Sequence, residues 1–116
     1  MQLTLAEFPD AIADFESRLN LQNRQISTLL AAIVEIESEV DSAIAFDANL
    51  KNDAQRKAKR AELLAETFYQ KCLADCEEAQ DRRREVEIDL ERLQNLFTIA
   101  KLQMRHETAQ LEQAIA

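Results

Sequence analysis

The sequence predicts an all-α protein: a long antiparallel helical hairpin, or coiled coil, with an overhanging C-terminal helix. Two features of its composition support this fold class. The chain has 116 residues with no glycine and one proline, Pro9, so the residues that usually form turns are almost absent. Apolar residues make up 47% of the chain but aromatic residues only 5%, which is typical of helix interfaces and not of sheet cores. We therefore expect one helical domain over residues 1–116.

The first helix is predicted over about residues 10–46. Thr4 and Glu7 have the spacing of a capping box, and Pro9 offers a second start, so the helix could begin at either place. Gln22 is the one polar residue in the apolar row, where a polar side chain costs stability but fixes register or strand number. The row, with three- and four-residue steps, consists of Ile12, Phe15, Leu19, Ile26, Leu29, Ile33, Ile36, Val40 and Ala43.

Two further apolar residues widen the row of the first helix. Leu30 and Ile44 each lie one residue after a member of the row. A two-stranded coiled coil does not need such a wide apolar face. We therefore expect the first helix to contact more than one neighbour.

The turn is predicted at about residues 47–52, where the apolar spacing breaks and Asp and Asn residues gather. These residue types tolerate left-handed backbone when glycine is absent. Asn52 and Gln55 can cap the next helix, which is predicted over about residues 53–115 in one piece. Because this helix is much longer than the first at about 1.5 Å per residue, we expect residues 91 onward to lack an intrachain partner.

The unpartnered part of the second helix is the predicted self-association surface. Its apolar side chains cover an arc of about 160° around the helix, more than a two-stranded interface requires. The residues are Leu93, Leu96, Phe97, Ile99, Ala100 and Met104. We therefore expect a homodimer or a higher homo-oligomer. The apolar leader with Leu3, Leu5 and Phe8 offers a competing account, because it could fold over the same surface within one chain.

Two basic segments differ in their surroundings. Residues 82–84 are three arginines among acids, and Glu78 and Glu87 are spaced to form helix-surface pairs with them; Arg83 could also reach Glu16 on the facing helix. The second segment lies at the predicted hairpin tip, with few acids nearby and beside a helix N-terminus, which attracts anions. This tip cluster consists of Arg56, Lys57, Lys59 and Arg60. It is the candidate nucleic-acid-binding site, and the simpler interpretation is a charged, solvated tip.

Cys72 and Cys76 share one helical face and are predicted to be small buried residues with free thiols. Zinc requires four ligands, and the only histidine, His106, is thirty residues beyond Cys76, so a metal site would need two chains. No base adjoins a nucleophile, and glycine-rich phosphate-binding loops are absent. The sequence therefore predicts a protein that is not an enzyme and has no cofactor or metal.

The charge and hydropathy of the chain predict a cytoplasmic protein with no membrane partner. A formal net charge of −8 opposes non-specific attraction to phosphate backbones and anionic lipids. No apolar run is long enough to cross a bilayer, and the N-terminus lacks the features of a secretory signal.

Parts of the chain resemble small coiled-coil proteins of bacteriophages and prophages. The matching segments are residues 50–58 with 61–64, and residues 96–102. In those relatives a turn similar to KNEAQRKA precedes a long helix, and an aromatic-aliphatic-lysine segment closes it. The resemblance implies a helical phage accessory protein, encoded near DNA-recombination functions, and it supplies no catalytic residues.

These observations favour a non-enzymatic interaction protein, an adaptor or scaffold that binds itself and another helical protein. The alternative is an accessory nucleic-acid-binding protein of DNA recombination or replication that uses the tip cluster. The two hypotheses differ in salt dependence. Contacts with phosphate weaken steeply as ionic strength rises, whereas association of apolar helix faces responds little.

Overall fold

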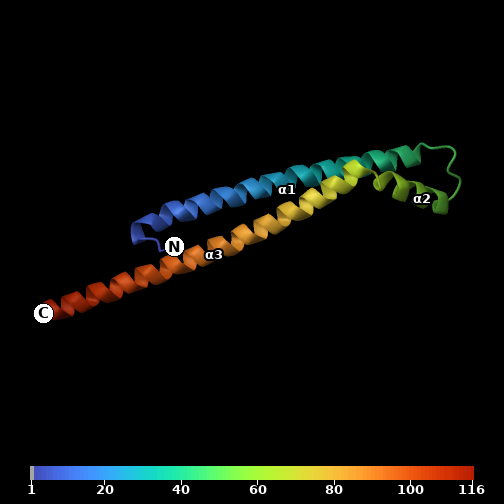
Figure 1. The fold of residues 1–116 in the computed structure, drawn as a ribbon. Helices are drawn as coiled ribbons and strands as arrows, with labels where there is room; N and C mark the ends of the chain where they lie inside the picture. Colours follow the sequence, from blue (N-terminus) through green and yellow to red (C-terminus); the bar gives the residue numbers. More distant parts are fainter. Residues whose placement is uncertain (1) are drawn as a thin grey trace. The chain divides into compact units, whose positions relative to one another are not determined.

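The structure, a computed structural model, describes residues 2–116 and confirms the all-α hairpin (Figure 1). A short 3₁₀ turn is followed by three helices, and residues 2–116 contain no strand. The elements are the 3₁₀ turn Leu5–Glu7, α1 (Phe8–Ala45), α2 (Asp53–Leu64) and α3 (Thr67–Ile115).

The chain forms two compact units, which are described separately. The tip unit is Gln22–Arg82, and the terminal unit combines Met1–Leu21 with Arg83–Ala116. Both α1 and α3 therefore contribute residues to each unit.

Both predicted starts of the first helix are used. The backbone N–H and the hydroxyl of Thr4 donate hydrogen bonds to Glu7 Oε1 at 2.9 and 2.7 Å, which holds the 3₁₀ turn. Helix α1 then begins at Phe8, with Pro9 in its first turn, where a missing N–H costs no helical hydrogen bond. The leader is thus joined to α1 by an ordered turn.

The connection between α1 and α2 contains no left-handed residue, since no non-glycine residue within 2–116 has a positive φ. The turn lies where it was predicted, between Ala45 and Asp53, but its Asp and Asn residues do not adopt the left-handed backbone that they tolerate. Asp47 Oδ1 accepts the Asn49 N–H at 2.9 Å, and the Leu50 N–H reaches the Asp47 carbonyl at 3.3 Å. The connection is long enough for these side-chain-supported turns to reverse the chain.

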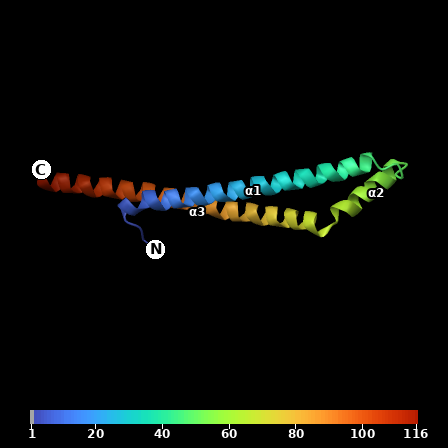
Figure 2. The ribbon, with the colours of Figure 1, turned by 90° about the horizontal axis from the view of Figure 1, so that it is seen from above.

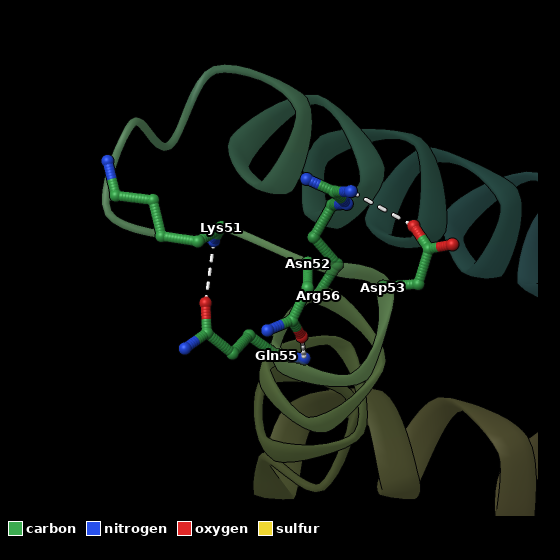
Figure 3. Close-up of polar contacts among 5 residues, drawn as sticks. All are labelled: Lys51, Asn52, Asp53, Gln55 and Arg56. Atoms are coloured by element: carbon green, nitrogen blue, oxygen red, sulfur yellow. Dashed lines mark hydrogen bonds and ion pairs between the residues drawn. The ribbon is translucent and has the colours of Figure 1, made fainter.

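The start of α2 follows the predicted capping (Figure 3). Asn52 Oδ1 accepts the Gln55 N–H at 2.9 Å, and Gln55 Oε1 accepts the Lys51 N–H at 2.6 Å. Two backbone donors at the helix start are thus satisfied by side chains.

The second half of the hairpin is not one helix, which corrects the predicted continuous helix over 53–115. Helix α2 ends at Leu64, α3 begins at Thr67, and the two meet at an angle (Figure 2). The Gln70 side-chain amide donates to the Leu64 carbonyl at 2.9 Å, so this carbonyl has a partner although the helix ladder stops there. Neither glycine nor proline marks the break.

The core lies in the tip unit, between α1 and α3. Its members are Ile26, Ile33, Tyr69, Cys72, Cys76 and Ala79. Ile26 and Ile33 belong to the predicted apolar row of the first helix. Leu29, Ile36 and Leu64 pack against the core. Cys72 and Cys76 are therefore buried free thiols, as small residues of a helix interface should be.

Candidate interaction surfaces

In the terminal unit, the N-terminal residues pack on α3. The Phe8 and Phe97 rings are stacked with centroids 5.3 Å apart and planes 18° apart, and Phe8 is only 5% exposed. Lys101 Nζ lies 4.4 Å from the Phe97 ring centroid, a distance at which a cation is attracted to an aromatic face. The prediction that α3 lacks an intrachain partner from residue 91 onward was therefore wrong for residues 93–100.

The bend between α2 and α3 explains why pairing reaches further along α3 than a straight hairpin would allow. In the tip unit, Arg60 binds Asp41, and Tyr69 binds Glu37. The two acids on α1 are four positions apart in the sequence, whereas their partners are nine positions apart. The additional residues are taken up at the break, so α1 pairs with residues of α3 that come later in the sequence.

A groove lies between the leader and α3, so the leader does fold over this part of α3 within one chain, which was the competing expectation. Its volume is about 540 Å³. One side is formed by Gln2, Leu3, Thr4 and Phe8, and the other by Leu93, Leu96, Ile99, Ala100 and Gln103. The leader thus covers part of the predicted self-association surface. The groove is the space between the leader and α3 that neither fills.

The predicted self-association residues fall into two groups. Leu93, Phe97 and Ala100 are half-buried, and they lie on the side covered within the chain. Leu96, Ile99 and Met104 remain exposed, at 45%, 50% and 48%. Leu93, Leu96, Ile99 and Ala100 line one groove, whereas Met104 lies further along α3.

The last part of α3 is exposed on all sides. Every residue from 101 to 116 is exposed, including the apolar residues Leu102, Met104, Leu111 and Ile115. Both ribbon views show α3 continuing beyond the start of α1 (Figures 1 and 2). The overhanging C-terminal helix of the predicted fold is therefore confirmed, although it begins about ten residues later than expected.

The tip cluster is less electropositive than its sequence suggests. Arg56 pairs with Asp53 at 2.9 Å (Figure 3), Lys59 with Glu62 at 3.7 Å, and Arg60 with Asp41 of α1 at 2.8 Å. The hydrogen bond to Asp41 also raises the pKa of the Arg60 guanidinium. Within residues 2–116, Lys57 is the one member of the cluster with no ion pair.

The arginines at residues 82–84 form local pairs. Arg82 binds Glu78 at 3.0 Å, and Arg83 binds Glu87 at 3.6 Å, which confirms the predicted helix-surface pairs. The expected contact of Arg83 with Glu16 was wrong. A partner one helical turn away on the same helix requires less ordering of the long side chain than one on another helix.

Two polar side chains at the helix interface, Tyr69 and Gln22, differ in whether they have a hydrogen-bond partner. The Tyr69 hydroxyl donates a hydrogen bond to Glu37 Oε1, which links α3 to α1 and raises the pKa of Tyr69. Gln22 Oε1, in contrast, is buried and has no hydrogen-bond partner within residues 2–116. Gln22, the one polar residue in the predicted apolar row, therefore has a side-chain oxygen that accepts no hydrogen bond from residues 2–116.

An apolar surface on the outer side of α1 contains Leu30, one of the two residues that widen the predicted row, whereas the other, Ile44, is half-buried. Leu30 is 45% exposed and Val34 63% exposed, so the face on which they lie is not covered within the tip unit. A shallow groove of about 630 Å³ runs along it, lined by Leu30, Ala31, Val34, Glu35, Ser38 and Glu39. We call these six residues the α1 outer face.

Comparisons with known proteins provide no relative. No family model, curated protein or solved structure matches the chain. Over residues 2–116, the structure has no group of three or more His, Cys, Asp or Glu side chains placed to hold a metal ion. None of the helices in this part of the chain combines the length and apolar character needed to cross a bilayer.

Proposed function

We propose that this protein is a non-enzymatic coiled-coil interaction protein, an adaptor or scaffold, that associates with a second copy of itself through the exposed side of α3. The observation that carries the proposal is the run of exposed apolar residues on one helix. Its members are Leu96, Ile99, Leu102, Met104 and Leu111.

Burial of this surface can offset the cost of joining two copies. Complete burial of a fully exposed large apolar side chain stabilises a complex by about 1.5–3 kcal/mol. Because these five residues are about half exposed in the single chain, two copies together gain roughly 7–15 kcal/mol, against the roughly 4–15 kcal/mol that association costs in lost freedom. The half-buried Leu93, Phe97 and Ala100 lie beside this surface, on the side of α3 that the chain itself covers.

Sedimentation of a double variant tests the proposal. Leu96→Asp with Ile99→Asp places two charges in the surface without touching the Phe8–Phe97 stack. We expect wild type to associate at about 100 μM and the variant to be monomeric. Leu21→Asp with Phe68→Asp is the control, because it replaces two apolar residues elsewhere that are at least as exposed. A monomeric wild type contradicts the proposal.

The alternative, nucleic-acid binding through the tip cluster, has less support because three of its four cations are paired with acids. Replacing Arg56, Lys57, Lys59 and Arg60 by Ala should abolish any binding of DNA that wild type shows at low salt. Undiminished binding by this variant would contradict the assignment to the tip. Encoding by a bacteriophage also stays a prediction from the sequence resemblance.

A further inference from the structure

The partner surface for α3 can be named, if self-association itself holds as proposed above. We propose that α3 of one copy docks on the α1 outer face of a second copy. Ile99 and Leu102 pack against Leu30 and Val34, and Lys101 and Arg105 lie beside Glu35 and Glu39.

The two faces match in their apolar residues. On α1, Leu30 and Val34 are one helical turn apart, and both are largely exposed. On α3, Ile99 and Leu102 are spaced by three residues and are 50% and 56% exposed. Pairs at these spacings form the ridges and grooves by which two helices pack. Each face lines a shallow groove that the chain itself leaves open.

The two faces also match in charge. Glu35 and Glu39 are four residues apart on α1, and Lys101 and Arg105 are four residues apart on α3. Like charges at this spacing lie next to each other on a helix surface and repel. None of the four makes an ion pair within residues 2–116. Lys101 Nζ lies over the Phe97 ring in the single chain, and the proposed contact replaces this interaction with an ion pair. Bringing the two pairs together relieves both repulsions and forms flanking salt bridges like those that select coiled-coil partners.

The charges of the segments around these four residues also favour a contact between the two helices. Residues 30–46 carry four acids and no base. Residues 101–116 carry two bases, Lys101 and Arg105, followed by two acids, Glu107 and Glu112. A chain with a formal net charge of −8 repels its own copies at long range. Self-association therefore favours contacts between regions of opposite local charge, and residues 30–46 are the more acidic partner for Lys101 and Arg105.

The geometry of the contact has a consequence for assembly. The two faces are different surfaces of one chain, so each copy carries both halves of the contact. Such contacts either close between a small number of copies or continue into longer assemblies. The exposed Leu30 and Val34 of one copy are then covered by its neighbour, which explains why α1 has a wider apolar row than its intrachain partner requires.

A charge-exchange experiment tests this contact. The first variant is Glu35→Lys with Glu39→Lys, and the second is Lys101→Glu with Arg105→Glu. We expect each variant alone to sediment as a monomer where wild type associates, because like charges then face each other. An equimolar mixture of the two variants should associate again, since each substituted face then meets an opposite charge. Wild-type association should also weaken as salt rises.

Sedimentation also measures the control variant and gives the results that would contradict the proposed contact. Glu77→Lys with Asp81→Lys changes two exposed acids at the same spacing outside both faces and should associate like wild type. If both charge variants associate like wild type while Leu96→Asp with Ile99→Asp is monomeric, the α1 outer face is not the partner and self-association through α3 stands. A mixture that stays monomeric also overturns the contact, and a monomeric wild type overturns both proposals.

Discussion

The two units of this protein use the same helices in different ways. In the tip unit, α1 and α3 bury a shared apolar core, and side chains bind across the helices: Tyr69 to Glu37, and Arg60 to Asp41. In the terminal unit, Phe8 is the one buried residue between Gln2 and Leu21 or from Arg83 onward. The last part of α3 is exposed on every side.

This difference separates residues that hold the fold from residues that are available for partners. The tip unit buries its core within one chain, so substitutions of the core residues should act mainly on folding. Its exposed α1 outer face is the exception, because Leu30 and Val34 are available to a partner. The terminal unit leaves large apolar side chains in water, so its substitutions should act mainly on association. A helix with the same spacing of apolar residues can therefore have a structural part and an interaction part.

The largest expected effect contrasts one isoleucine from each unit. Ile33→Ala removes buried contacts in the tip unit and should lower the free energy of unfolding by about 2–5 kcal/mol. Ile99→Ala alters an exposed residue and should change it by less than about 0.5 kcal/mol in dilute protein. Urea unfolding of both variants measures the difference, and equal losses would remove the distinction between the units.

A smaller effect is expected for the hydroxyl of Tyr69. Tyr69→Phe removes its hydrogen bond to the Glu37 carboxylate and should lower the free energy of unfolding by about 1.5–3 kcal/mol. Thermal unfolding of this variant near neutral pH measures the loss. An unchanged midpoint would mean that this contact does not help to hold α3 on α1.

The same contact predicts a pH dependence. The hydrogen bond to Glu37 raises the pKa of Tyr69 above its ordinary value of 10.0, so the folded chain holds this proton more tightly than the unfolded chain. The resulting stabilisation is complete below pH 10.0 and is lost as pH rises through the higher folded-state value. Tyr69 is the only tyrosine, so tyrosinate absorbance reports it directly. Glu37→Gln should lower the measured pKa, and an unshifted titration in that variant contradicts the assigned cause.

The smallest expected effect is a gain at the interface. Gln22→Leu replaces a buried carbonyl oxygen that has no partner within residues 2–116, and should raise the free energy of unfolding by about 1–2 kcal/mol. Gln25→Leu is the control, because Gln25 is exposed and offers no such gain. A loss of stability in the Gln22 variant, seen by thermal unfolding, would show that this oxygen has a partner in solution.

The features that sequence predicted are those determined by neighbours along the chain. The three-and-four spacing placed Ile26, Ile33, Cys72 and Cys76 in the interface, and local capping rules located both helix starts. These interactions involve residues within about one helical turn or on one repeating face, so they can be recognised without coordinates.

The missed features depend on contacts between distant residues. The break after Leu64 has no glycine or proline, and its carbonyl is satisfied by a side chain six residues away. The Arg60–Asp41 pair joins residues nineteen apart, so Arg60 looked unpaired in the sequence. The pairs of Arg56 with Asp53 and of Lys59 with Glu62 are local, and their spacing could have revealed them. The stack of Phe8 on Phe97 required knowing how far the bend shifts the pairing of the helices.

The central claim is that the tip unit is stable within one chain, while the exposed end of α3 needs a second copy. Amide hydrogen exchange measured at low and high protein concentration compares the two regions in one experiment. We predict that amides of residues 101–115 exchange more slowly as concentration rises, whereas amides of the core residues Tyr69 to Ala79 exchange at the same rate throughout. Exchange of residues 101–115 that is independent of concentration, up to about 100 μM, would contradict the account.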